Sequence, residues 1–235
     1  MAPRLAGYDG VYVAVSAATD PRLATELGAA GVGVVSGQSG LIGETRRRAL
    51  GAAAAVDHPA FLYCDFDRWL FWAERFPDEL ASLPTRLAAR RPRLWYACLG
   101  RTPRAFATHP RVQRITEGAT NRALSAAIGR RVDATAGACW LSGEGAKIVL
   151  RDSIEPTNAT DLEWPALIHR ADPRRLGALA VDGLAFETAS FYPDEVAAAG
   201  GESAWVTARY ERPEVWLARL RLATDSVAAL CRALG

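Results

Sequence analysis

Four short apolar runs, separated by segments of helical character, constrain the fold of the first hundred residues most strongly. They cover residues 11–16, 31–36, 61–64 and 94–99. Runs this short that are rich in β-branched or aromatic residues are typical of buried strands. Near-continuous apolar strands that alternate with helices indicate a mostly parallel sheet covered by helices on both faces, so we expect an α/β fold.

Helix signals lie between these runs. Asp20-Pro21 places a capping residue before a proline at the first helical position. A glycine-rich stretch precedes the helix predicted at residues 44–55. Two more helices are predicted at residues 68–76 and 79–89, on either side of a proline. The first half of the chain therefore predicts a Rossmann-like succession of strands and helices.

The second half of the chain is less regular. Helices are predicted at residues 112–128 and 144–150, and strand-like runs at residues 137–141 and 179–186. A final helix, predicted at about residues 213–234, has an apolar face that can dock on the sheet or on a second subunit, which allows a homodimer. No repeat, low-complexity tract or linker divides the sequence, so we expect residues 1–235 to form one domain.

Composition excludes several classes of protein. Half of the residues are hydrophobic and 23% are charged, which is ordinary for a globular protein and too apolar for a disordered one. The formal charge is only +2 and the basic clusters are scattered, so nucleic acid is not an expected partner. The four cysteines show neither zinc spacing nor a disulfide framework. Without a long apolar stretch or a signal-peptide pattern, we expect a cytoplasmic protein that lacks a transmembrane segment.

Two aspartates stand directly after the third apolar run. Ligands of open parallel sheets bind beyond the carboxyl ends of the strands, which is where Asp65 and Asp67 are expected. Side chains two residues apart at a strand end can point to the same side, and paired carboxylates suit Mg²⁺ or Mn²⁺, which also take phosphate oxygens. The alternative is that both acids cap the helix that follows.

The sequence around these aspartates, FLYCDFDRWL, superficially resembles the first motif of haloacid-dehalogenase-like phosphatases. In that family one aspartate attacks phosphate and the second acts as acid or base. The motif normally opens the domain, whereas here two strand–helix units precede it. A metal-dependent phosphohydrolase is one alternative function, and a non-catalytic nucleotide-binding or assembly protein is another.

The order of the motifs instead resembles the nucleotide-diphosphosugar transferases of the GT-A fold, in particular family 2-like and mannosylglycerate-synthase-like members. In these proteins a D-x-D ends a central strand, as Asp65-Phe66-Asp67 does. VYVAVSAATD resembles the opening strand and loop that hold the base, and Gly43-x-x-x-Arg47 resembles the glycine and basic helix start before the D-x-D. The resemblance implies a GT-A domain whose residues 1–100 bind the nucleotide and whose residues 101–235 bind the acceptor.

The resemblance also implies an activity and a donor site. The activity is metal-dependent transfer of a sugar from a nucleotide-diphosphate sugar to an acceptor hydroxyl. The cation, Mg²⁺ or Mn²⁺, is implied at Asp65 and Asp67, with His169 as a further ligand by analogy with the mannosylglycerate-synthase-like members. Donor contacts are implied for Ser16, Thr19, Asp20, Gly43, Arg47 and Asp65.

The downstream segments resemble the acceptor side of the same family. GACWLSGEGAKIVLRDS resembles the stretch beneath the acceptor pocket, and TDLEW falls where inverting members carry an acidic motif that deprotonates the acceptor. Asp161 or Glu163 would be that base. Further acceptor candidates, for which side-chain pairing and ring packing are the alternatives, are Arg101, Glu117, Asn121, Trp140 and Trp164. The resemblance leaves open whether the acceptor is a small molecule or a lipid-linked one. It also leaves open whether the transfer retains or inverts the anomeric configuration of the sugar.

Overall fold

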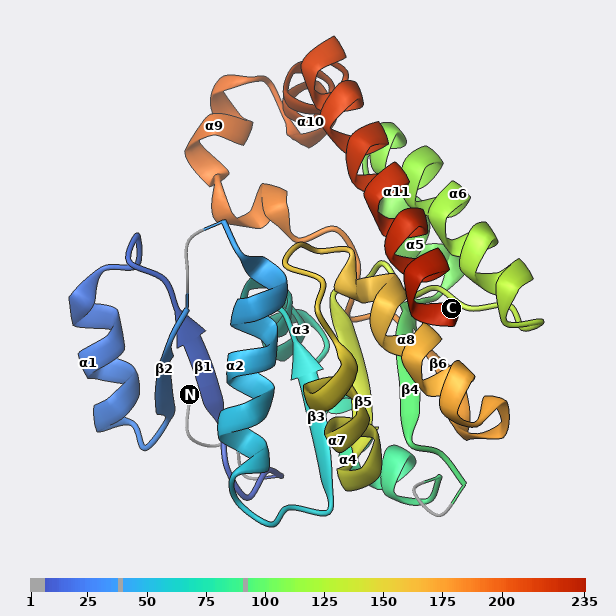
Figure 1. The fold of residues 1–235 in the computed structure, drawn as a ribbon. Helices are drawn as coiled ribbons and strands as arrows, with labels where there is room; N and C mark the ends of the chain where they lie inside the picture. Colours follow the sequence, from blue (N-terminus) through green and yellow to red (C-terminus); the bar gives the residue numbers. More distant parts are fainter. Residues whose placement is uncertain (1–6, 38–39, 91–92) are drawn as a thin grey trace.

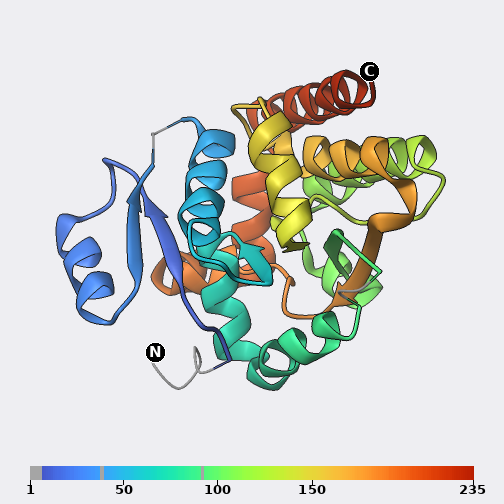
Figure 2. The same ribbon diagram turned by 60° about the horizontal axis from the view of Figure 1, so that its bottom comes forward.

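Two sheets organise the chain in the computed structural model, which describes residues 7–37, 40–90 and 93–235. The smaller sheet pairs β1 (Tyr12–Val15) with β2 (Gly33–Ser36) in parallel, and α1 (Pro21–Ala29) connects the two strands. This unit lies at one side of the molecule (Figures 1 and 2). Val13, Leu27 and Val32 form its own small core.

The larger sheet has the order β3 (Ala60–Cys64), β5 (Ala138–Ser142), β4 (Tyr96–Arg101), β6 (Leu176–Val181). β4 and β6 are parallel, whereas β5 runs antiparallel to both of its neighbours. The expectation of a mostly parallel central sheet is therefore wrong, and the architecture is α/β with a mixed sheet. β5 is reversed because the chain enters it at the edge where β3 and β4 end, opposite Cys64.

Helices cover both faces of the larger sheet (Figures 1 and 2). On one face lie α2 (Ile42–Ala54), α7 (Gly143–Asp152) and α8 (Thr160–Ala171), and on the other lie α3 (Phe66–Arg75) and α4 (Pro77–Ala88). The side chains of β3 alternate between these two faces. Phe61 and Tyr63 belong to the first face, and Leu62 and Cys64 belong to the second. The side chain of Tyr63 therefore points toward α8.

Two long helices complete the first face. α6 (Arg111–Ala127) follows the short α5 (Pro103–Thr108), and the last helix is α11 (Pro213–Leu234). The apolar face of α11 packs on α8 and α6, where Leu230 and Ala233 join the main core. The structure thus docks this helix on neighbouring helices of the same chain (Figure 1).

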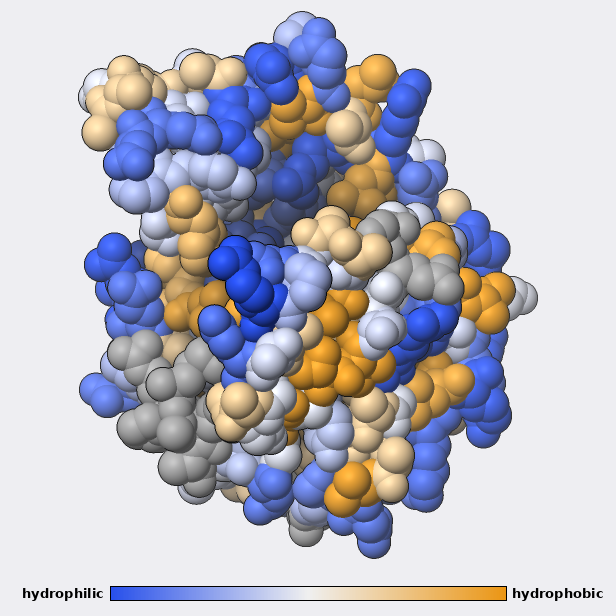
Figure 3. Space-filling model, turned by 90° about the vertical axis from the view of Figure 1, so that its left-hand side faces the viewer, coloured by the Kyte–Doolittle hydropathy of each residue, from blue (hydrophilic) through white to orange (hydrophobic). Residues whose placement is uncertain are grey.

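A separate helical region lies between β6 and α11. After β6, which η2 (Pro173–Arg175) precedes, the chain forms η3 (Thr188–Phe191), α9 (Pro193–Ala198) and α10 (Glu202–Tyr210) around a core of Phe186, Ala189 and Trp205. α9 and α10 form the uppermost part of Figure 1, and the surface is hollowed below this part in Figure 3. In the part of the chain that the structure describes, no helix has the length and apolar character needed to cross a membrane.

Candidate functional site

Asp65 stands at the carboxyl edge of β3, next to the start of β5. The pairing of Cys64 with Ala138 brings the Asp65 N–H within 2.9 Å of the carbonyl oxygen of Gly137. Gly137 has a φ of +65°, and a Cβ on it would lie 2.3 Å from Asp65 Oδ2. Glycine is thus required at this position for two reasons: it adopts this backbone conformation, and it leaves room for the carboxylate of Asp65.

Arg46 joins this carboxylate to a second one. Its Nη2 lies 2.8 Å from Asp65 Oδ2, and its Nη1 lies 2.5 Å from Asp161 Oδ1 and 2.9 Å from the hydroxyl oxygen of Thr160. The Arg46 side chain is only 4% exposed. A buried guanidinium between two carboxylates ties α2 and the start of α8 to the end of β3.

Tyr63 supports the same group from within the sheet. Its hydroxyl donates to Asp65 Oδ1 at 2.5 Å, and its ring lies 5.5 Å from the Arg46 guanidinium. The Trp164 ring meets Tyr63 edge-on with 5.7 Å between centroids. Both oxygens of Asp65 are therefore engaged. Although Asp65 occupies the N-cap position of α3, its side chain makes no capping hydrogen bond.

Asp161 has the chemistry of a base that works near neutral pH. Burial raises its pKa to about 6, and the negative charge of Asp65 adds to this rise, while Arg46 opposes it. A carboxyl with such a pKa is ionised at pH 7 and still basic enough to accept a proton from an activated hydroxyl.

Two cavities meet at this cluster. The larger, of about 790 Å³, lies between the small sheet and the α2–β3 region, and its lining includes Ser16, Thr19, Phe66 and Trp69. The smaller, of about 70 Å³, has walls from α3, α6, α8 and α11. Arg46 and Asp65 line both cavities, and Asp161 lines the smaller one. The arrangement can hold two different molecules on either side of one group of charges.

Comparison with known proteins does not assign the chain to a family. The chain matches no family model. No curated protein and no solved structure matches it either. Its function is therefore inferred from the geometry of the site and from the sequence.

The implied metal site does not match the arrangement of the carboxylates. Asp65 binds Arg46 and Tyr63, whereas Asp67 is exposed and accepts the N–H of Arg68 at 2.8 Å. Among residues 7–37, 40–90 and 93–235, no three His, Cys, Asp or Glu side chains form a group that could hold a metal ion. The protein's own side chains thus do not form a complete Mg²⁺ or Mn²⁺ site in this arrangement, and the chemistry of the site is derived from its side chains alone.

The predicted donor residues separate into two groups. Ser16, Thr19 and Asp65 line the large cavity. Asp20, in contrast, caps α1 by accepting the N–H of Arg22 at 2.9 Å. The other two hold α2 against the loop before α8: the N–H of Gly43 donates to the carbonyl oxygen of Pro156 at 2.8 Å, and Arg47 donates to that of Glu155 at 2.6 Å.

The two candidate bases have different surroundings. Glu163 is buried, and its carboxylate accepts the N–H groups of Ile154 and Glu155 at 2.8 and 3.0 Å and the hydroxyl of Ser153. These bonds fix the loop before α8 and use both oxygens. Asp161 is bound through Oδ1 to Arg46 and lines the small pocket. Of the two, Asp161 alone faces a cavity.

The predicted acceptor residues form a network behind the small pocket. Arg101 is buried and pairs with Glu117 at 2.6 Å and Asp133 at 2.8 Å. Asn121 donates to Asp133 at 2.6 Å. Although burial acts to raise the pKa of Asp133, the hydrogen bond from Arg101 lowers it below its usual value. Within this network, Glu117 lines the pocket.

Three further candidates lie elsewhere. Trp140 is buried in β5 and contributes to the large cavity. Trp164 is buried in α8, where its indole N–H donates to the hydroxyl oxygen of Ser153 at 3.0 Å. His169 lies in the last turn of α8, at the end opposite Asp161.

Sequence reasoning missed Arg46, Tyr63 and Arg68. A signal for Arg46 exists, because the buried positions of α2 are Gly43, Arg46 and Leu50, which recur with helical spacing and leave Arg47 beside this face. Tyr63 lies two residues before Asp65 and shares its side of the strand. No signal in the sequence marks Arg68 apart from its place after the aspartates.

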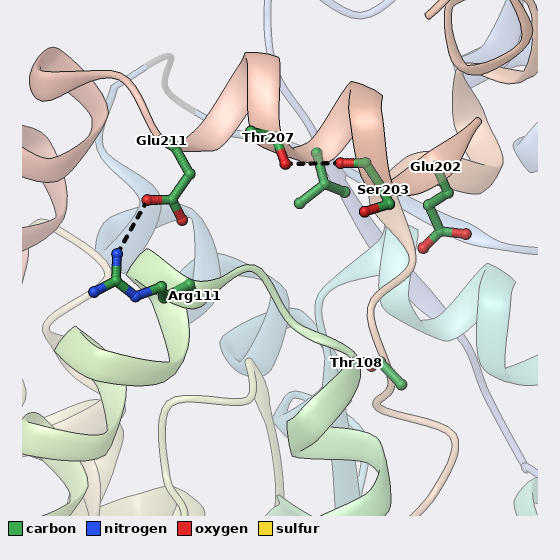
Figure 4. A pocket seen from close by; sticks show the side chains of 7 residues that line it. Thr108, Arg111, Glu202, Ser203, Thr207 and Glu211 are labelled. Atoms are coloured by element: carbon green, nitrogen blue, oxygen red, sulfur yellow. Dashed lines mark hydrogen bonds and ion pairs between the residues drawn. The ribbon is translucent and has the colours of Figure 1, made fainter. Parts of the chain in front are cut away.

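A separate depression lies at the helical region. It is lined by Thr108, Arg111, Glu202, Ser203, Val206, Thr207 and Glu211. Figure 4 shows Arg111 and Glu211 facing each other across it, with 3.6 Å between Arg111 Nη1 and Glu211 Oε2. The hydroxyl of Thr207 donates to the carbonyl oxygen of Ser203 at 2.9 Å. Its lining shares no residue with the two cavities that meet at Arg46.

Proposed function

We propose that this protein is a glycosyltransferase that moves a sugar from a nucleotide-diphosphate sugar to an acceptor hydroxyl. The observation that carries the proposal is the meeting of two unlike cavities at Arg46 and Asp65. A hydrolase needs room for one substrate and a water molecule, whereas a group transfer needs two adjoining sites around one reacting centre. The order of motifs along the sequence points to the same activity.

The large cavity suits the donor. Its volume of about 790 Å³ falls within the range of small-molecule sites, roughly 300–1,000 Å³. Aromatic rings such as Tyr12, Phe61 and Trp69 offer apolar contact for a nucleobase, and the hydroxyls of Ser16 and Thr19 offer hydrogen bonds. Asp65 lines both this cavity and the small pocket, and in our proposal the scissile bond of the donor lies at this junction.

Asp161 is the base in this proposal. Its carboxylate accepts the proton of the acceptor hydroxyl while the hydroxyl oxygen forms a bond to the anomeric carbon. The bond from that carbon to the diphosphate oxygen breaks, and its electron pair leaves with the nucleoside diphosphate. The hydrogen bonds that Arg46 donates to Thr160 and Asp161 hold the start of α8, so that Asp161 keeps its place at the pocket.

The cation, Mg²⁺ or Mn²⁺, enters the proposal as a companion of the donor. Magnesium in nucleotide sites is commonly held by one or two carboxylates together with substrate phosphates, and it neutralises phosphate charge there. Because Asp65 is paired with Arg46 and Asp67 lines neither the large cavity nor the small pocket, we assign no carboxylate of the protein to this cation.

The test is release of nucleoside diphosphate from a panel of UDP-, GDP-, ADP- and dTDP-sugars, with Mn²⁺ or with EDTA, in the presence of mixed hydroxylated acceptors. We expect release with at least one donor, and Asp161→Asn should slow it by about 10²–10⁴-fold, as the loss of a general base does. Binding of the nucleoside diphosphate should persist in that variant. The matched control is Asp78→Asn, an exposed aspartate of α4, which should behave as the wild type.

Two results would refute the proposal. One is the absence of both binding and release with every donor in the panel. The other is equal turnover by Asp161→Asn and the wild type with a donor that does react, because the carboxylate at the junction would then have no part in the transfer.

A further inference from the structure

The walls of the small pocket are formed almost entirely by polar side chains. Arg68 comes from α3, Thr116, Glu117 and Thr120 from α6, and Arg219 and Ser226 from α11, while Thr135 and Asn158 lie on loops. Leu222 and Ala223 of α11 are its aliphatic contributions. A pocket with this lining binds through hydrogen bonds rather than through burial of apolar surface.

Charges in the pocket balance. The described lining residues include the cations Arg46, Arg68 and Arg219 and the anions Asp65, Glu117 and Asp161. Arg46 pairs with both aspartates, and Arg219 lies 3.3 Å from Glu117. With these cations and anions paired, the described lining of the pocket has no excess charge that would favour an anionic or a cationic ligand. Desolvation of the charge then weighs against the charged ligand.

Residues that line the pocket carry a hydrogen-bond acceptor and hydrogen-bond donors that have no hydrogen-bond partner among the residues that the structure describes. Within the described part of the chain, Asn158 Oδ1 is buried without a hydrogen-bond partner, and so are Arg46 Nε and Arg68 Nη1. Arg68 Nη1 lies 3.6 Å from Glu187 Oε2, which is an ion-pair contact but too long for a hydrogen bond. Asn158, Arg68 and the threonines of α6 line the pocket, so the side chains around it offer both acceptors and donors, and a hydroxyl group is the ligand that donates and accepts at once.

We propose that this pocket is the acceptor site of the transferase and that the acceptor is a small, uncharged polyol, such as a free sugar, a sugar alcohol or a cyclitol. The inference rests on the proposed function. One hydroxyl lies against Asp161 and reacts, while neighbouring hydroxyls contact Asn158 and Arg68.

Size supports a small acceptor. The volume of about 70 Å³ is well below the roughly 150 Å³ of a cavity that holds benzene. It accepts a hydroxylated carbon or two, and the remainder of the molecule lies outside this volume. A lipid chain would find few apolar contacts here, since the side chains of α6 and Asn158 that line the pocket are polar.

The experiment uses matched acceptors with the donor that gives the strongest release. Sorbitol is compared with gluconate, myo-inositol with inositol 1-phosphate, and both neutral polyols with a long-chain alcohol in detergent micelles. We expect the neutral polyols to raise the release of nucleoside diphosphate by about tenfold or more over donor alone, as expected of an oriented acceptor. The charged analogues and the alcohol should give less than a third of that rate.

Two variants connect this activity to the pocket. Ala223→Leu places three additional carbons at the wall of the pocket, and Ala228→Leu makes the same change on α11 at a position outside the lining. Ala223→Leu should lower polyol-dependent release by about tenfold while the thermal shift with nucleoside diphosphate persists, because steric blockage acts on the acceptor alone. Asn158→Ala, which introduces no bulk, should raise the KM for the polyol by about tenfold through loss of a hydrogen bond.

The outcomes separate the two proposals. Nucleotide binding with release that responds to gluconate or to the long-chain alcohol, and not to the polyols, would overturn the acceptor assignment and leave the transferase standing. Wild-type polyol kinetics in both Ala223→Leu and Asn158→Ala would overturn the acceptor assignment as well. Failure to bind any nucleoside diphosphate would instead refute the transferase itself.

Discussion

Burial of Asp161 sets the pH range in which this residue can act as the proposed base. Burial and the charge of Asp65 raise its pKa to about 6, against the pull of Arg46. As a base, the carboxyl must be ionised, so activity is lost as the pH falls through this value. We expect kcat/KM for the donor to rise from pH 5 to about pH 7 and then to level off, with the inflection near 6.

A pH–rate profile of the wild type checks this prediction. The groups that face Asp161 and set the inflection are Arg46, Asp65 and Arg68. Both arginines stay protonated over the whole range, so they add no inflection of their own. A profile without an inflection between pH 5 and 8 would exclude Asp161 as the base.

Gly137 is a second residue whose identity the site requires. An alanine there would have to adopt a φ of +65° and would bring its Cβ to 2.3 Å from Asp65 Oδ2. We expect Gly137→Ala to lower the free energy of unfolding by about 1–3 kcal/mol, since strain and displacement of Asp65 combine. Urea unfolding measures the loss. Gly129→Ala, which has a similar φ of +64° but open space around it, separates the backbone strain from the clash.

Either result of the comparison between Gly137→Ala and Gly129→Ala is informative. A much larger loss for Gly137→Ala than for Gly129→Ala supports the close approach of Asp65. Equal losses would mean that the carboxylate does not lie against Gly137.

At the scale of elements, α2 determines which arginine enters the site. Arg46 lies on the buried face of α2 between Asp65 and Asp161, whereas Arg48 pairs with Glu44 at 2.6 Å on the exposed face. Removing a buried cation leaves two carboxylates without a partner. We expect Arg46→Ala to cost about 3–5 kcal/mol of stability. Arg48→Ala should cost no more than about 0.5 kcal/mol, as an exposed i,i+4 pair does.

Chemical denaturation of both variants provides the comparison. Similar, small losses for the two arginines would mean that the Arg46 ion pairs are not formed in solution. Asp65 and Asp161 would then lack the group that holds them together at the junction of the cavities.

Local elements were largely predictable from the sequence because each has its own signal. Asp20-Pro21 marks the start of α1, and the prediction of a final helix at residues 213–234 is confirmed by α11. Strand direction has no such local signal. β5 looks like any other apolar run, and its reversal depends on where the preceding chain enters the sheet. The strand-like run predicted at residues 179–186 is shifted toward the C-terminus relative to the observed strand. β6 covers Leu176–Val181, and turns follow it.

The candidate site was predictable only in part. A strand end with acidic residues is visible in the sequence, and Asp65 lies at the centre of the cluster. The contacts between Arg46 and Asp161 join residues 115 positions apart, so no local pattern reveals them. The choice between Asp161 and Glu163 likewise needed the fold, because both stand on the first turn of α8 and only their surroundings differ.

At the scale of the whole molecule, two cavities share one charged cluster, and the proposed function depends on both. The large cavity separates the β1–β2 unit from the larger sheet, and the small pocket lies where α3, α6, α8 and α11 come together. In the proposed function, the large cavity holds the donor and the small pocket holds the acceptor, with Arg46 between them.

The most direct test of the central claim is a thermal-shift titration of UDP, GDP, ADP and dTDP against the wild type and two variants of α2 in which an alanine is replaced. Ala49 lines the large cavity and Ala52 does not. At about 100 times the Kd, a nucleoside diphosphate should stabilise the protein by about 2.7 kcal/mol and raise Tm by about 5–10 °C. We expect this shift in the wild type and in Ala52→Phe and its loss in Ala49→Phe, whose ring occupies the donor cavity. No shift with any of the four, or a shift that Ala49→Phe retains in full, would contradict the assignment of this cavity to the donor.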